Sequence, residues 1–246
     1  PNVNARYHPT ENTADYRNEV SRTILTNKAI PAFFNDIQNI QTLVDQGETE
    51  EHARDYAVIG CVELGSVGRD YSASSSVFIP MYTVLYMALH NGRTTVTGDK
   101  SLWKATGKPE DFDTFEKFWD AYAEQTRLTA ENAISLNNTY GKNHQEFLPT
   151  PILSAMFHGP MDKGRDLING GSIYNSSGVT HIAFPDVCDS ICAIRDVCFT
   201  EDNTDMQMSL SELVKAVDNN FEGNKLLEAY LKNKAPKYGT NHPIAK

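Results

Sequence analysis

The stretch Tyr56-Ala57-Val58-Ile59-Gly60-Cys61-Val62-Glu63 decides the fold. Its opening residues form a short apolar run, which predicts a strand buried on both faces. Cys61 follows at the end of that strand, and Glu63 stands two residues beyond it. Gly65 and Gly68 come next and predict an irregular loop. The sequence therefore predicts a thiol and a carboxylate held close together at the end of a strand.

A thiol and a carboxylate at a strand end suit three roles. The first is a buried structural pair, which residue type and spacing alone favour. The second is a thiolate nucleophile, which needs an activating histidine. The third is a sulfur that carries a radical beside a carboxylate that moves protons, because a carboxylate kept from water has a raised pKa. The chain offers four histidines for the second role, none in a diagnostic context: His52, His90, His144 and His158.

The composition excludes several classes of protein. The 246 residues include 32 acidic side chains against 22 Lys plus Arg, a net charge of −10, and this acid excess argues against nucleic-acid binding. Hydrophobic residues make up 40% of the chain and charged ones 22%, as in a globular protein. The longest apolar runs, residues 77–81 and 84–89, are far shorter than the roughly 20 residues of a membrane span. Motifs for nucleotide, phosphate or zinc binding and for serine hydrolases are missing from the sequence.

Three further cysteines, Cys188, Cys192 and Cys198, lie close together in sequence. They contain no Cys-x-x-Cys pair, so we expect no metal site among them. Their spacing predicts reduced thiols that pack on one helix.

The rest of the chain predicts mainly helices joined by turns that Gly and Pro mark. A capping-box pattern at Asp113-Thr114-Phe115-Glu116 opens the clearest of them, with an aromatic stripe at Phe115, Phe118, Trp119 and Tyr122 that we assign to the core. Short segments interrupted by glycines follow from residue 148 to 184. The remaining helices are predicted over 12–27, 32–44, 48–54, 80–91, 186–199, 209–217 and 224–231.

Residues 58–63 resemble the cysteine loop of the glycyl radical enzymes, the pyruvate formate-lyase-like superfamily. Further segments resemble that family in the same order from about residue 55 to 239. They are Met87-Ala88-Leu89-His90-Asn91-Gly92, Leu148-Pro149-Thr150-Pro151-Ile152-Leu153-Ser154, Asp162-Lys163-Gly164-Arg165-Asp166, Gly170-Gly171-Ser172-Ile173-Tyr174-Asn175, Asp189-Ser190 with Ala193-Ile194, Asn220-Phe221-Glu222-Gly223 and Ala235-Pro236-Lys237-Tyr238-Gly239.

The resemblance implies a reaction. A stored glycyl radical oxidises the loop cysteine to a thiyl radical, which removes a hydrogen atom from the substrate and later returns it. Cys61 matches the thiyl cysteine, and Glu63 matches the carboxylate of members that eliminate a leaving group or decarboxylate. Acyl-transferring members have two adjacent cysteines, which Gly60-Cys61 does not match, and members that add hydrocarbons to fumarate usually lack the carboxylate. The implied activity is a lyase of the dehydratase or decarboxylase type.

Departures from the family pattern bear on the substrate. Leu64 stands where dehydratases often have Pro, and residues 72–76 lack the Asp that diol dehydratases place after the loop. Ser75 and Phe78 are expected near the substrate and would give a partly apolar wall. These differences disfavour glycerol and propanediol. They leave an arylacetate-type decarboxylase, or a lyase that acts on another small polar compound.

The resemblance also implies an architecture and partners. The expected fold is α/β: residues 1–246 form a predominantly helical portion of one ten-stranded barrel domain, with the cysteine loop near 58–68. The family's C-terminal segment with the radical glycine has no match in the sequence, so we expect a central portion of a longer chain that is inactive alone. We expect no directly bound cofactor or metal, and a glycyl radical installed by an activating enzyme with S-adenosylmethionine and an iron–sulfur cluster. We also expect a homodimer that works in an anaerobic cytoplasm and has no nucleic-acid or membrane partner.

Three hypotheses stay open. The first is the radical lyase, and the second is a catalytically silent structural or regulatory module descended from the family. The third and weaker one is a conventional cysteine hydrolase.

Overall fold

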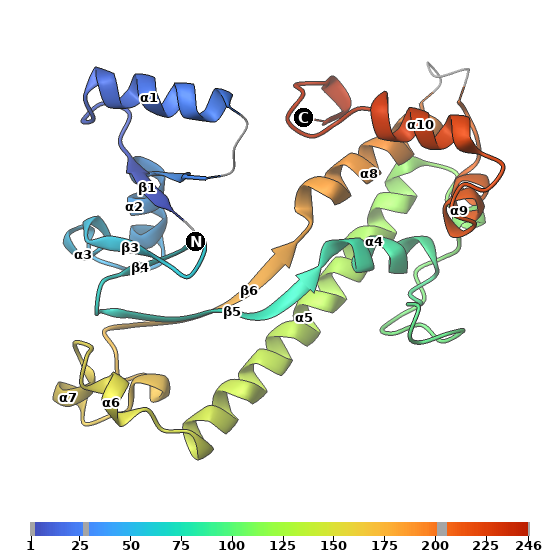
Figure 1. Ribbon diagram of the computed structural model, residues 1–246. Helices are drawn as coiled ribbons and strands as arrows, with labels where there is room; N and C mark the ends of the chain where they lie inside the picture. Colours follow the sequence, from blue (N-terminus) through green and yellow to red (C-terminus); the bar gives the residue numbers. More distant parts are fainter. Residues whose placement is uncertain (1–2, 27–29, 201–205, 246) are drawn as a thin grey trace. The chain divides into compact units, whose positions relative to one another are not determined.

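A computed structural model describes residues 3–26, 30–200 and 206–245, without the side chains of residues 74 and 75. The chain divides into two compact units: residues 1–76 with 139–178, and residues 77–138 with 179–246. About half of the chain is helical, which gives a mixed α/β piece (Figure 1). None of the helices in the described ranges is long and apolar enough to cross a membrane.

The first unit opens with a parallel strand pair and three capped helices. Strand β1 (Asn4–Tyr7) pairs with β2 (Ala32–Asn35), and α1 (Ala14–Leu25) lies between them in sequence. Helices α2 (Asp36–Asp45) and α3 (Glu50–Arg54) follow β2. Side-chain oxygens of Thr13, Asn35 and Thr49 cap the three helices by accepting backbone N–H groups of the first turn.

The predicted helix over 32–44 begins too early. Residues Ala32 to Asn35 are extended and pair with β1, and the helix starts only at Asp36, where the Asn35 side chain accepts the N–H of Ile37. The apolar spacing of Phe33 and Phe34 fits either structure, and the distant partner strand decides between them.

A β-hairpin forms the centre of the first unit. Strand β3 (Tyr56–Ile59) pairs antiparallel with β4 (Glu63–Ser66), in a register from Tyr56↔Ser66 to Ile59↔Glu63. The predicted strand is confirmed, but its burial on both faces is wrong. Tyr56 is buried against Leu43 and Ala53 while Ala57 is exposed, because a two-stranded hairpin has only one face on this core. Gly65, predicted in a loop, lies in β4.

The first unit also contains short helical segments after the long helix α5 (Phe115–Phe147). These are α6 (Pro151–Ser154), α7 (Pro160–Lys163) and the 3₁₀ turn η2 (Leu167–Asn169). Asp166 joins them, because its carboxylate accepts the N–H of Thr150 at 2.8 Å and of Ile168 at 3.1 Å.

Two longer strands pair with each other, β5 (Asp70–Pro80) and β6 (Tyr174–Ile182). Serine-rich and glycine-interrupted sequences predict neither of them. In the described ranges the strands form three two-stranded sheets.

The second unit is a helical bundle. Helix α4 (Met81–Leu89) packs with the first half of α5 and with α8 (Phe184–Cys198) and α9 (Leu210–Asp218) in one core, which α10 (Lys225–Asn233) joins through Leu227. Short 3₁₀ turns η1 (Pro109–Asp111) and η3 (Pro243–Ala245) flank it. The predicted helix over 209–217 is confirmed as α9, and a capping box opens it: the Ser209 hydroxyl accepts the N–H of Glu212, and the Glu212 carboxylate accepts the N–H of Ser209.

Two details of α5 differ from prediction. Helix α5 begins at Phe115, and Thr114, not Asp113, offers its side-chain oxygen to the N–H of Lys117 at 3.4 Å. Asp113 instead pairs with the Lys117 ammonium at 2.9 Å. Of the aromatic stripe, Phe118 is fully buried, whereas Trp119 is 46% exposed and lies outside the core.

The three cysteines of the predicted helix lie on α8 as free thiols, and Cys192 is buried. Burial, with a smaller effect of the Glu212 charge, raises the pKa of the Cys198 thiol to about 12. Cys198 packs against the core of the second unit, and we expect its thiol to react slowly. No group of three His, Cys, Asp or Glu side chains suited to a metal occurs among the described residues.

Candidate active site

Cys61 lies at the tip of the β3–β4 hairpin. The pair Ile59↔Glu63 closes a three-residue loop, Gly60-Cys61-Val62. Gly60 has a φ of +62°, which residues with a side chain rarely adopt, so glycine is favoured there. A Cβ at this position would also lie 3.3 Å from a carboxylate oxygen of Glu63. The sequence Gly-Cys-Val between the two paired strands thus presents the thiol on a tight turn.

The Glu63 carboxylate folds back onto this turn. Its Oε2 accepts the backbone N–H of Cys61 at 3.2 Å and the N–H of Val62 at 3.1 Å. These two hydrogen bonds fix the carboxylate beside the cysteine, so the pair predicted from sequence is brought together. The Cys61 thiol is free and exposed in this chain.

An ionic anchor holds the start of β3. The Arg6 guanidinium binds Asp36 through two nitrogens, at 2.8 and 3.0 Å, and lies 4.1 Å from the centre of the Tyr56 ring. The Tyr56 hydroxyl donates to Asp36 at 2.5 Å. Burial acts to raise the pKa of Asp36, but the hydrogen bonds from Arg6 and Tyr56 outweigh it, so the pKa is lowered. The carboxylate therefore stays charged and ties β1, α2 and β3 together.

Two buried acids lie at the other end of β4. Glu48 is 7% exposed and hydrogen-bonds the Ser66 hydroxyl, which also lies 2.8 Å from the His52 carbonyl oxygen. Asp70 is 8% exposed, and its Oδ1 has no hydrogen-bond partner among the described residues. Burial, and then the charge of Glu48, raise the pKa of Asp70 to about 6. Sequence reasoning missed this pair, because no motif or spacing connects the two acids.

Two of the four candidate histidines for a thiolate nucleophile have other partners. His52 Nδ1 lies 2.8 Å from the Tyr174 hydroxyl, and His90 of the second unit pairs with Asp218 at 3.0 Å. In the described ranges, none of the hydrogen bonds joins the Cys61 thiol to an imidazole. The geometry gives the cysteine hydrolase hypothesis no support.

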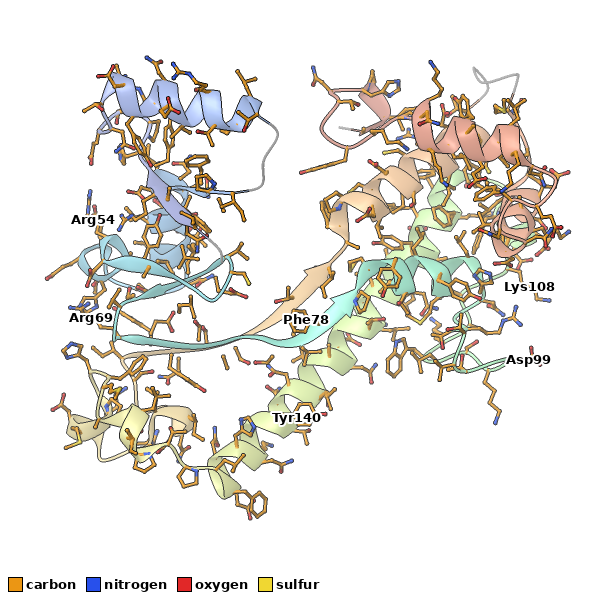
Figure 2. The ribbon with its side chains drawn as sticks, in the orientation of Figure 1. Arg54, Arg69, Phe78, Asp99, Lys108 and Tyr140 are labelled. Carbon is orange, nitrogen blue, oxygen red and sulfur yellow. The ribbon has the colours of Figure 1, made fainter. Side chains whose placement is uncertain are left out.

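The two expected substrate contacts lie on β5. The Ser75 side chain falls outside the described part of the structure. Phe78 belongs to the second unit and is 56% exposed (Figure 2). Contact of Ser75 and Phe78 with a substrate therefore stays a prediction.

The pyruvate formate lyase-like family model matches residues 1–246. The chain belongs to this family of glycyl radical enzymes. The resemblance carried by residues 58–63 is confirmed at the level of the family.

Relatives in the glycyl radical family are lyases and dehydratases. Isethionate sulfite-lyase of Desulfovibrio desulfuricans is 32% identical over 249 residues, which cover 100% of this chain and 29% of that protein. Trans-4-hydroxy-L-proline dehydratase of Clostridioides difficile is 31% identical over 216 residues, 87% of this chain and 26% of that protein. The solved structure of the B12-independent glycerol dehydratase from Clostridium butyricum matches with a TM-score of 0.84 at 27% identity, over 100% of this chain and 30% of that one. The chain therefore spans less than a third of these relatives.

Glycyl radical enzymes use a radical on a glycine that an activating enzyme installs. The hairpin of β3 and β4 with Cys61 at its tip, called the cysteine hairpin below, suits a thiol that exchanges a hydrogen atom with such a radical. Its thiol is uncommitted, and it stands on a turn where the chain presents it outward. No buried cluster of metal ligands competes for it in the described ranges.

Proposed function

We propose that the protein containing this chain is a glycyl radical lyase, in which Cys61 exchanges a hydrogen atom with the substrate and Glu63 moves a proton. One observation carries the proposal: the Glu63 carboxylate is fixed at 3.2 and 3.1 Å from the backbone N–H groups of Cys61 and Val62. Family membership supplies the chemical context.

The family's glycyl radical supplies the single unpaired electron that the reaction uses and regains. Cys61 gives up its thiol hydrogen atom to the glycine that carries the radical and then works as a hydrogen-atom carrier: a new S–H bond forms while a substrate C–H bond breaks. Glu63 takes the proton of a hydroxyl on the radical carbon and passes it to the leaving group, which departs from the neighbouring carbon with its bonding electrons. The S–H hydrogen of Cys61 returns to the product. Each turnover converts a hydroxyl-bearing substrate into a carbonyl compound and the protonated leaving group, with no net oxidation.

Elimination is the favoured reaction. The relatives named above are a sulfite-lyase and two dehydratases, and a carboxylate beside the cysteine serves proton transfer during elimination. We propose a small polar organic substrate with a leaving group next to a hydroxyl, and Ser75 and Phe78 among its contacts. Decarboxylation of an arylacetate is the other outcome that the same pair of residues permits.

The complete protein is proposed to follow the family's architecture. The hairpin would enter a ten-stranded α/β barrel, to which residues 1–246 contribute one portion. We propose activation by an enzyme that uses S-adenosylmethionine and an iron–sulfur cluster, assembly as a homodimer, and work in an anaerobic cytoplasm.

Product analysis tests this proposal. The full-length protein is activated anaerobically, its radical is counted by spin resonance, and it is offered a hydroxysulfonate, a hydroxyproline, a diol and an arylacetate separately. We expect the hydroxysulfonate to give a carbonyl product, or the hydroxyproline to give a cyclic imine, with one equivalent of leaving group in either case. The diol is the disfavoured substrate and should give little product. Release of carbon dioxide from the arylacetate would show that the reaction is decarboxylation and not elimination. A full radical signal without product from any of the four would support a catalytically silent module.

A further inference from the structure

A groove lined by aromatic side chains opens on the second unit, between α5, α8 and the segment that follows α10 (Figure 1). We call it the aromatic groove, and its cavity has a volume of about 550 Å³. Trp119, Phe184 and Tyr238 line it and are each about half exposed, whereas Val187 and Cys192 line it and are buried. Exposed aromatic side chains gathered around a concave surface are typical of a place where another segment or molecule binds.

Contacts within the second unit hold the walls of the groove. Phe115 and Trp119 lie one turn apart on α5, and their rings stack with centroids 6.2 Å apart. Phe184, at the start of α8, meets the Tyr238 ring edge-on at 6.2 Å. The backbone N–H of Tyr238 in turn donates to Asp189 at 2.6 Å. The walls are therefore preformed, which lowers the entropic cost of binding an occupant.

Arg195 gives the groove a positive charge. Its guanidinium lies 5.0 Å from the centre of the Phe115 ring, and within the described ranges it has no ion-pair or hydrogen-bond partner. An occupant that covers the groove would take water from this guanidinium and must offer an acceptor in return. A carboxylate fits best, because its two oxygens match the guanidinium in a bidentate pair.

The rest of the protein itself is the occupant that these observations favour. Residues 1–246 cover 29% of isethionate sulfite-lyase of Desulfovibrio desulfuricans, so a protein of that length has most of its residues outside this chain. A second copy fits less well, because a two-fold contact would place the groove against itself. Two concave surfaces cannot fill each other.

We infer that in the complete protein the aromatic groove holds a segment from outside residues 1–246, which places an apolar side chain in the cavity and an acidic side chain on Arg195. This inference goes beyond the proposed function and does not depend on it, because it concerns how the fold is completed and not the chemistry of Cys61.

Photo-crosslinking in the full-length protein identifies the occupant. p-Benzoylphenylalanine in place of Trp119 keeps an aromatic side chain at the wall. After irradiation we expect a product with the mass of one chain, in which the crosslinked peptide lies outside residues 1–246 and has Asp or Glu close to the crosslink. A product with the mass of two chains, or a crosslink confined to residues 1–246, would overturn the inference.

Alkylation of the Trp119→Cys variant decides the case in which no crosslink forms. A covered thiol reacts only when the protein opens locally, so the native variant should be labelled at least about tenfold more slowly than the same variant in urea. Mass spectrometry of the peptide that contains residue 119 measures both rates. Equal rates, or protection that is lost on dilution as for a second copy, would overturn the inference.

Reversal of the charge at Arg195 tests the acidic partner. Arg195→Glu is expected to speed the native labelling of Trp119→Cys about tenfold or more, because two like charges would then meet in the covered groove. A Lys in place of the crosslinked acid should restore slow labelling in the combined variant. Arg22→Glu, at an exposed arginine of α1, is the matched control and should leave the rate unchanged. Unchanged labelling in Arg195→Glu would overturn the assignment of an acidic partner.

Discussion

At the scale of single residues, Glu63 is the group whose chemistry depends most on its surroundings. Two backbone N–H groups hold one of its oxygens at the turn, while its side chain must exchange a proton with the substrate. Glu63→Gln keeps the shape and removes the acid–base function. We expect radical content to stay at the wild-type level and product formation to fall by about 10² to 10⁴. Product at the wild-type rate per radical would remove Glu63 from the mechanism.

Asp70 makes stability depend on pH. Its pKa is raised from 3.8 to about 6, so the folded protein binds the proton more tightly than the unfolded chain. Well below pH 3.8 the group is protonated in both states and costs nothing. As the pH rises through 6, the buried charge destabilises the fold by up to about 3 kcal/mol. Asp70→Asn is therefore expected to raise the free energy of unfolding at pH 7 to 8 and to change it little at pH 4.

Urea unfolding of the full-length protein at both pH values measures this effect. Asp99→Asn is the matched control, because Asp99 is fully exposed and its change should be small at either pH. Equal stabilisation by Asp70→Asn at pH 4 and pH 8 would contradict the account.

Cys198 is expected to resist alkylation. Burial raises its pKa to about 12, so almost no thiolate is present at pH 8. Iodoacetamide should leave Cys198 unmodified in the native protein and modify it after unfolding in urea, as read by mass spectrometry of its peptide. Rapid native labelling would show that this part of α8 is not packed as described.

At the scale of elements, the β3–β4 hairpin depends on its anchor at Tyr56. The Tyr56 hydroxyl donates to a charged carboxylate, and such bonds contribute about 1.5 to 3 kcal/mol. Tyr56→Phe should lower the free energy of unfolding by about that amount. Tyr140→Phe is the control, because Tyr140 is 52% exposed on α5 and should tolerate the loss of its hydroxyl. An equal, small effect of both substitutions would show that the anchor contributes little.

Local signals predicted most elements of this chain and missed those that depend on distant partners. Helices α8 and α9 are specified by nearby residues, through the apolar spacing of α8 and the capping box at Ser209, and both lie where the sequence predicts a helix. β2 was mistaken for the start of a helix because its partner, β1, lies 28 residues away in register. The residues of the candidate site show the same difference between local and distant signals. Cys61 and Glu63 are neighbours in sequence and were found there, whereas Asp70 and Ile59 meet at Gly65 only after folding.

At the scale of the whole molecule, the chain spans less than a third of the relatives it matches. The Cys61 thiol is exposed in this chain, and the proposed thiyl radical would need cover from water and oxygen, which the rest of the complete protein would supply. The cysteine hairpin is nevertheless formed by this chain's own residues, from Arg6 and Asp36 at its base to the Gly60 turn at its tip. The chemistry proposed for Cys61 therefore belongs to the complete protein, while the local geometry belongs to this chain.

The most direct test of the central claim is product formation per radical in the full-length Cys61→Ala variant. The account predicts a glycyl radical signal of wild-type size and no product, because the hydrogen-atom carrier is gone. Cys188→Ala, the same change on α8, should keep wild-type turnover. Product from the Cys61→Ala variant at the wild-type rate per radical would contradict the account.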